Sequence, residues 1–292
     1  MNEQIFDPLI RIAGERPAMQ EERQAAIGPD ELQTAYKTLL KYKEGKANLE
    51  KRLVDAQQWY KLRQWECLRK SGKDQVEPVS AWLFNVIANK HADAMDNFPS
   101  VSILPRERGD EEEARMLSSV VPAVMEACDF ESVYSAVMDD KLICGTGVYG
   151  VFWDGSQSGG LGDIKISPVD VIDLFWESGI TDIQQSRQLF HVSLADRDII
   201  EQDYPAVAGK LTAPAPDMAK YVYDDTVDTS GKCLVVDWYY KKRQEGRTVL
   251  HYCKFVPGCE EPLFATENET EDEVDGLGGI VRPAPAKRGW YD

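Results

Sequence analysis

Apolar residues recur every three or four positions between residues 30 and 70, which is the spacing of one face of an α-helix. The residues that carry this spacing are Leu32, Tyr36, Leu39, Leu40, Leu49, Leu53, Ala56 and Tyr60. Asp30 and Gln33 follow Pro29 closely, and they fit a pair that caps a helix N-terminus. Gly45 weakens the pattern without ending it. We therefore predict one long helix that begins near residue 30 and ends near residues 70–72.

Three further segments before residue 145 show helical spacing. We predict helices over about residues 80–97, from the acidic run at 110–113 onward, and over about residues 130–143. Negative charge is stabilised at a helix N-terminus, which is why the acidic run marks a beginning. In the helix that begins at residues 110–113, we expect four residues to face inward: Met116, Val120, Val124 and Met125. Val101–Leu104, followed by Pro105, is typical of a short strand.

After residue 147 the pattern changes from helical spacing to short runs rich in β-branched and aromatic residues. The strands that we predict are Val148–Trp153, Asp163–Ile166, Val169–Trp176, Gln188–Val192, Cys233–Lys241 and Thr248–Val256. A Gly/Ser loop at 155–162 joins the first two strands as a hairpin. A short helix is predicted at Asp196–Asp203. Long helices followed by mainly antiparallel strands define an α+β fold.

The chain divides where these patterns change. We predict an N-terminal arm over 1–29, a helical region over 30–145, an antiparallel β domain over 146–256, and an acidic loop with an incomplete C-terminal segment over 257–292. Pro257–Val281 carries eight acidic residues and no basic one, which is typical of a solvated loop. The alternative is a surface that repels phosphate or meets a basic partner.

Composition and charge exclude several classes of protein. The 292 residues include 33 basic and 50 acidic side chains, and the net charge of −17 argues against a protein that holds nucleic acid through its net charge. Residues 1–75 carry +2 and residues 76–292 carry −19, so the acidity lies in the later part. No run approaches the roughly 18 apolar residues of a membrane span, and no signal peptide pattern begins the sequence. The six scattered Cys are typical of reduced, cytoplasmic thiols.

One motif resembles a nucleotide site in its letters. Gly145-Thr146-Gly147-Val148-Tyr149-Gly150 matches G-x-G-x-x-G. A dinucleotide site needs a strand before this motif and a helix after it, so that the pyrophosphate meets a helix N-terminus. Here a predicted helix precedes the motif and a strand follows. We therefore interpret Gly145 and Gly147 as a helix cap and a turn into the sheet.

Metal and catalytic motifs are equally weak. His251, Cys253 and Cys259, with Cys233 upstream, lack the close C-x₂₋₄-C pairs of a structural zinc site. The sequence contains no nucleophile elbow, P-loop or zinc-protease motif. The remaining ionisable candidates are His91 and His191, expected to be ordinary part-buried imidazoles, and the pairs Asp139-Asp140 and Asp224-Asp225, expected to be solvated. We predict no catalytic, cofactor or metal site, and no enzyme.

Trp59, Tyr60 and Trp65 crowd the end of the first helix, among Lys61, Arg63 and Arg69. Aromatic and basic residues of this kind bind single-stranded nucleic acid in some proteins. Large aromatics at helical spacing more often pack against a neighbouring helix, and we favour that reading.

One long stretch resembles a known family. Trp82–Pro105 resembles the helix and following strand that precede the wing sheet in tailed-bacteriophage portal proteins. The block Phe130–Asp154 adds a helix that runs through Cys144-Gly145-Thr146-Gly147 into a strand. The segments that follow in the family's order are Gly162–Ile166, Val169-Asp170, Phe175–Glu177, Asp182–Gln184 and Asp196–Pro205. Together they cover about residues 50–240.

The resemblance implies a virion protein with a wing-like β domain that forms a ring, dodecameric in this family, at one capsid vertex. Such rings conduct double-stranded DNA during packaging and ejection, without sequence-specific binding and without a catalytic site of their own. The implied partners are further copies of the chain, capsid and scaffold proteins, head-to-tail adaptors and the terminase large subunit. Assembly would take place in the host bacterial cytoplasm. An acidic channel wall would repel phosphates and let DNA slide.

The sequence departs from the family in its length. Complete portal proteins continue with a stem and a clip, whereas this sequence stops at Gly289-Trp290-Tyr291-Asp292. We therefore expect a truncated chain that lacks the terminase-docking part.

Two alternatives stay open at this point. The first is another phage head-assembly or adaptor protein with the same α+β layout, which ring-shaped particles in electron micrographs would count against. The second is a nucleotide-binding enzyme that uses the Gly145–Gly150 loop. Marked thermal stabilisation by a nucleotide would favour the enzyme.

Overall fold

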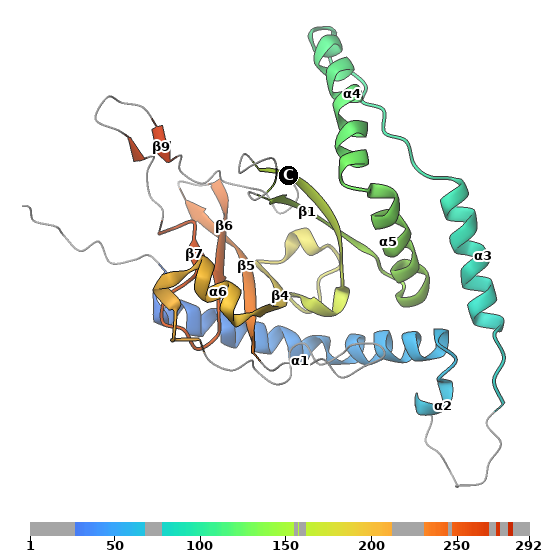
Figure 1. Ribbon diagram of the computed structural model, residues 1–292, viewed down its shortest axis with the longest axis horizontal. Coiled ribbons are helices and arrows are strands. Elements are labelled where there is room, and N and C mark those ends of the chain that lie inside the picture. Colours follow the sequence, from blue (N-terminus) through green and yellow to red (C-terminus); the bar gives the residue numbers. More distant parts are fainter. Residues whose placement is uncertain are drawn as a thin grey trace, which may run out of the picture.

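The computed structural model describes residues 27–67, 78–154, 157, 162–211, 231–244, 247–268, 273–274 and 280–282. These residues form two parts (Figure 1). The body comprises the described residues of 27–60 and 170–268, and the limb comprises those of 78–169. Residues 1–26 of the predicted arm, Asp224-Asp225 and residues 283–292 lie outside the described residues. Helices followed by antiparallel sheets confirm the α+β class.

The helices are α1 (Pro29–Tyr60), α2 (Gln64–Cys67), α3 (Trp82–Asp96), α4 (Glu111–Ala127), α5 (Phe130–Cys144) and α6 (Arg197–Asp203). The 3₁₀ turns are η1 (Arg108–Asp110), η3 (Val171–Asp173), η4 (Ile183–Gln185) and η5 (Pro205–Val207). The strands are β1 (Val148–Asp154), β2 (Asp163–Val169), β3 (Leu174–Trp176), β4 (Gln188–Asp196), β5 (Lys232–Gln244), β6 (Arg247–Phe255), β7 (Phe264–Ala265), β8 (Glu273–Val274) and β9 (Ile280–Arg282).

The long first helix forms as predicted, but both of its ends differ. Gly28, not Asp30, is the N-cap, and its N–H donates to the Glu31 carboxylate at 3.0 Å in place of the expected pair with Gln33. At the other end α1 stops ten residues early. Leu62 adopts a left-handed backbone (φ 61°), which a helix cannot continue through. Gly45 does not interrupt the helix.

The predicted strand at Val101–Leu104 does not form. Ile103 instead bonds to a side chain of α4: its N–H donates to the Ser118 hydroxyl, and that hydroxyl lies 3.2 Å from the Ile103 carbonyl. A polar side chain therefore provides the backbone partner that a neighbouring strand would have supplied.

The predicted strand Val169–Trp176 is also interrupted. The Asp170 carboxylate accepts from the N–H of Ile172 at 2.9 Å, which turns the chain into η3 before β3 begins. The hairpin of β1 and β2 and the pair of β5 and β6 form as predicted.

The main sheet has the order β3-β4-β5-β6-β7, and each neighbouring pair is antiparallel. α1 runs along one face of this sheet and α6 lies on the other (Figure 1). The core under α1 contains Leu39, Phe175, Phe190, Val236 and Phe255, all at 1% exposure or less. Even-numbered residues of β5 face α1 and odd-numbered residues face α6, because side chains alternate along a strand.

The acidic segment from residue 257 is only partly the solvated loop that we predicted. Its first part packs on the sheet, where Cys259 and Ala265 are buried. Two short strands, β8 and β9, also fall within it. Acidic composition alone does not reveal the single apolar residues that reach the core.

Candidate subunit interface on the limb

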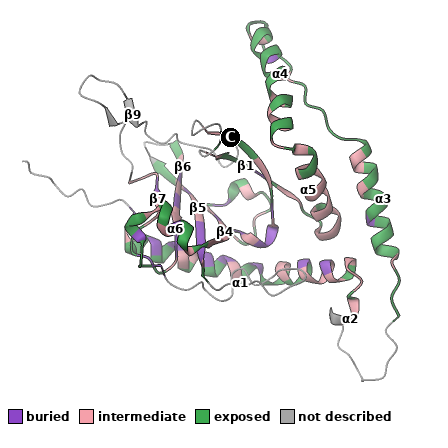
Figure 2. Cartoon of the chain, viewed as in Figure 1, coloured by how far each residue is buried: buried purple, intermediate pink, exposed green. Residues whose placement is uncertain are grey.

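The limb exposes an unusual amount of apolar side chain. Sixteen of the nineteen large apolar residues that are exposed in the described part of the chain lie between Val79 and Ile164. Within α3, α4 and α5 only Ile87, Ala114 and Val137 are buried. Figure 2 shows the contrast between the exposed helices of the limb and the buried strands of the body. A concentration of exposed apolar surface marks a place where another molecule binds.

α3 and α4 carry several of these residues. Trp82 is 77% exposed on α3, and Met116 and Val120 on α4 are 62% and 46% exposed. Met116 and Val120 were expected to face inward, and that expectation is wrong. The contacts of α3 and α4 with α5 leave these side chains uncovered.

The inner sides of the limb are held together by aromatic and polar contacts. Phe98 packs edge-on against Phe130 and Tyr134, with ring centroids 5.9 and 5.2 Å apart. His91 of α3 places Nε2 3.0 Å from the Ser135 hydroxyl on α5. These contacts fix the geometry of the limb while its outer surface stays open.

The hairpin of β1 and β2 continues this apolar surface. Tyr149, Val151 and Trp153 share one face with their cross-strand partners Pro168, Ile166 and Ile164. Phe130 of α5 covers the Tyr149 end, with ring centroids 5.8 Å apart. Val151 and Trp153 remain 59% and 55% exposed. A two-stranded ribbon is only marginally stable by itself, so this face too is suited to contact with another molecule.

The three glycines of the G-x-G-x-x-G motif have structural roles. Gly145 ends α5 in a left-handed conformation (φ 84°), which glycine adopts without strain. A Cβ at Gly147 would collide with the backbone carbonyl of Val137, so β1 can approach α5 only with glycine here. The ring of Phe152 covers Gly150. A helix precedes the motif and a strand follows it, as predicted.

The four residues considered for zinc do not gather in one place. Cys233 and Cys259 belong to the core under α6, whereas Cys253 lies in the core under α1, on the same face as His251. His251 instead places Nε2 3.7 Å from the Glu267 carboxylate. Among the described residues no group of three or more metal-ligating side chains is close enough to hold a metal ion.

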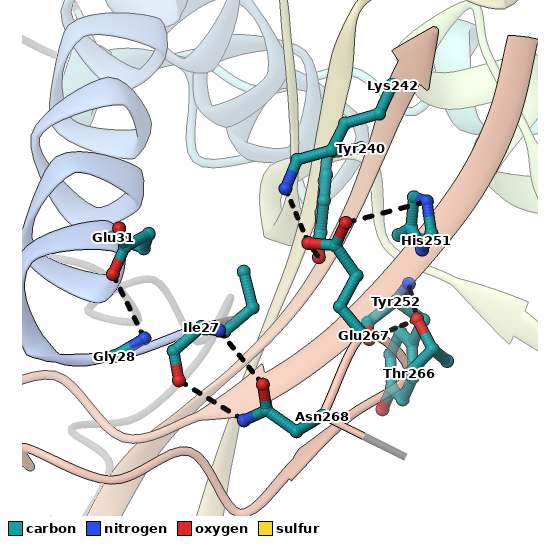
Figure 3. A network of polar contacts seen from close by, with 10 residues as sticks. All are labelled: Ile27, Gly28, Glu31, Tyr240, Lys242, His251, Tyr252, Thr266, Glu267 and Asn268. Carbon is teal, nitrogen blue, oxygen red and sulfur yellow. Dashed lines mark hydrogen bonds and ion pairs between the residues drawn. The ribbon is translucent and has the colours of Figure 1, made fainter. Parts of the chain in front are cut away.

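A polar network around Glu267 and Asn268 ties the end of the sheet to the start of α1 (Figure 3). Glu267 accepts from the Tyr240 hydroxyl at 2.8 Å and from Lys242 Nζ at 2.5 Å. Asn268 bonds Ile27 twice, accepting from its N–H at 2.9 Å and donating to its carbonyl at 3.2 Å. The network joins the residues just before α1 to the end of the main sheet.

The remaining sequence candidates divide into two groups. Tyr60 stacks on Phe84 of α3 with centroids 5.3 Å apart, which is the helix packing that we favoured over nucleic-acid binding. Trp65 donates its indole N–H to the Pro78 carbonyl at 3.1 Å. In contrast, Asp140 is half-buried instead of solvated. Burial, together with the negative charges of Asp170 and Asp139, raises the pKa of Asp140 to about 6.

The sequence already contained a signal for the exposed limb. In α3, Trp82, Leu83, Phe84, Val86 and Ile87 place apolar residues on more than one helix face. A helix that is apolar on several sides needs partners on several sides.

An α+β body that carries an exposed apolar limb is suited to association with other molecules. The chain belongs to the family of phage P22-like portal proteins, whose family model matches residues 48–284. Membership makes it a bacteriophage virion protein of genome packaging, in a family that is structural and not enzymatic. A comparison with curated proteins found no match. No helix among the described residues is long and apolar enough to cross a membrane.

Proposed function

We propose that the chain is a subunit of a portal ring at one capsid vertex, and that neighbouring copies cover the limb of each subunit. The exposed apolar surface of the limb is the observation that carries this proposal. Burying one large apolar side chain contributes roughly 1.5–3 kcal/mol, so even a few of the sixteen would drive association. The family match supports a second copy as the occupant.

The ring would conduct double-stranded DNA during packaging and ejection without holding it. The net charge of −19 over residues 76–292 supports this role, because a negative wall repels phosphates. Its partners would be capsid and scaffold proteins, the head-to-tail adaptor and the terminase. The dodecameric stoichiometry, assembly in the host cytoplasm and the four-part division at residues 29, 145 and 256 stay predictions.

The first experiment tests self-association. We expect purified protein to form rings that are visible by negative-stain electron microscopy and to have a multi-subunit mass by light scattering. The double substitution Met116→Ser with Val120→Ser should lower the assembled fraction at least tenfold at equal concentration. The control is Ile199→Ser, an equally exposed apolar residue (53%) on α6, outside the limb. A chain that stays monomeric at high concentration, or equal loss in the control, would contradict the proposal.

The second experiment tests the conduit. We expect weak binding to duplex DNA by fluorescence anisotropy at physiological salt, with little change between short duplexes of different sequence. Tight, salt-sensitive binding, or an assembled ring with a strongly positive channel, would overturn the proposed role of the acidic charge.

A further inference from the structure

A ring of more than two identical copies needs two different faces on each subunit. Every contact in such a ring is head-to-tail, so that one face of a copy meets a different face of the next copy. The exposed limb supplies one of these faces, and the proposed ring covers it with a neighbouring copy. The surfaces of α4 and α1 indicate which part of that neighbour it meets.

The exposed face of α4 combines apolar and acidic side chains. Glu112 and Glu113 precede Met116 by four and three residues, and Val120 follows it by four, so all four residues lie on one side of the helix. All four are exposed. Residues 78–169 as a whole carry six basic and fourteen acidic side chains, a net charge of −8. A surface that fits this face of α4 therefore offers apolar contact and positive charge.

The outer side of α1 carries positive charge. The buried residues of α1 face the sheet, and four basic residues on the opposite side of the helix are exposed: Lys37, Lys41, Lys51 and Arg52. Between residues 37 and 52, Glu44 is the only acidic residue that is exposed. We call these four basic residues the basic stripe of α1. Its charge is opposite to that of the limb, as complementary surfaces require.

Apolar residues accompany the basic stripe. Three large apolar residues outside the limb are exposed in the described part of the chain, and two of them, Leu40 (39%) and Trp59 (45%), belong to α1. Leu40 is three residues from Lys37, and Trp59 is seven residues from Arg52, so both lie on the side of the basic stripe. Within one subunit α4 stands away from α1 (Figure 1). The two faces are therefore available to different copies of the chain.

We propose that the outer side of α1 of one copy docks on the exposed face of α4 of the next copy. The basic stripe then meets Glu112 and Glu113, and Leu40 covers Met116. The stripe spans residues 37–52 and α4 has 17 residues, so at a rise of 1.5 Å per residue each is about 25 Å long. Apolar burial provides the affinity and the charges fix which faces pair. This contact presupposes the proposed ring and specifies two of the faces that form it.

Charge reversal in the intact chain tests the contact. Glu112→Lys together with Glu113→Lys should lower the assembled fraction, measured by light scattering, by about tenfold, because lysines would then face the basic stripe. Lys37→Glu together with Lys41→Glu should lower it by a similar factor from the α1 side. All four substitutions in one chain should restore most of the assembly, because opposite charges meet again.

The combined variant also separates the contact from an effect on α4 itself. Lysines in the first turn weaken a helix, because its N-terminus favours negative charge. Substitutions on α1 cannot repair that weakness, so restored assembly in the combined variant reports the contact. Circular dichroism should show that each variant is folded, since all four positions are exposed.

The matched control joins Glu112→Lys and Glu113→Lys to Arg243→Glu and Arg247→Glu, two exposed basic residues of β5 and β6. This control has the same net charge as the combined variant and should not regain assembly. Restoration in the control would show that net charge, and not the contact, governs association, and would overturn the proposal.

The wild-type chain separates this contact from the ring itself. If the wild-type chain stays monomeric at high concentration, the ring and this contact are both refuted. If the wild-type chain assembles and either reversed pair assembles equally well, or the combined variant does not recover, the ring stands and the contact between α1 and α4 is refuted.

Discussion

The body and the limb are built from similar amounts of apolar residue but use it differently. In the body, fifteen buried residues from α1 and the sheet form one cluster, and α6 closes a second cluster on the opposite face. In the limb, each of the three helices has one buried residue, while most of the exposed apolar side chains of the described chain lie there. The body therefore has a buried core of its own, whereas the limb leaves most of its apolar surface exposed.

This contrast explains why one chain can be both a stable fold and an assembly unit. α1 packs along the sheet and buries one side there, whereas α3 and α4 pack mainly on α5, with Tyr60 of α1 stacked on Phe84 of α3. Substitutions should therefore separate the two parts: those in the body should change the free energy of unfolding, and those in the limb should change association.

The largest effect is expected from Phe190→Ala in β4. Phe190 is fully buried, packs edge-on against Tyr42 of α1 and stacks on Trp238, with centroids 5.9 and 6.2 Å apart. The cavity should lower the free energy of unfolding by about 3–5 kcal/mol, measured by urea denaturation monitored by circular dichroism. A loss below about 1 kcal/mol would show that the sheet does not form the main core.

The next effect is expected from Gly147→Ala, at the point where β1 meets α5. The added Cβ would collide with the Val137 carbonyl, and relieving the clash should cost about 1–3 kcal/mol of stability. Gly109→Ala is the matched control, because a Cβ there meets nothing within 4 Å. Thermal unfolding of both variants checks the prediction. Equal behaviour of the two would mean that the close approach of β1 to α5 is not required.

A smaller effect is expected from Asn268→Ala, which removes both hydrogen bonds to Ile27. Ile27 is buried, so its backbone groups would lose their partners and stability should fall by about 1–2 kcal/mol. Hydrogen exchange should show faster exchange in the first turn of α1 and little change in the limb. Faster exchange throughout the limb would contradict the separation of the two parts.

The smallest effect on unfolding is expected from Trp82→Ser in α3. Because Trp82 is 77% exposed, the stability of the isolated chain should change by only about 0.5 kcal/mol. The assembled fraction measured by light scattering should fall at the same time. A large loss of stability with unchanged association would show that Trp82 is part of a core. It would contradict the difference between body and limb.

Much of this arrangement could be predicted from the sequence, since it depends on local period and local chemistry. Residues close together in the chain determine the helical spacing over residues 30–60 and the change to strands after residue 147. They also determine that a helix precedes the Gly145–Gly150 segment and a strand follows it. The likeness to portal proteins was visible for the same reason, because it rests on the order of these segments.

Only the tertiary structure decided which apolar residues are covered. Met116 and Val124 belong to the same helical pattern, yet Met116 is exposed and Val124 is partly covered, because α5 packs against only part of α4. It also separated Cys233 from Cys253, which face opposite sides of one sheet, and brought Asp140 beside Asp170 across thirty residues. Burial and charge coupling depend on what packs against a side chain, which spacing along the chain does not specify.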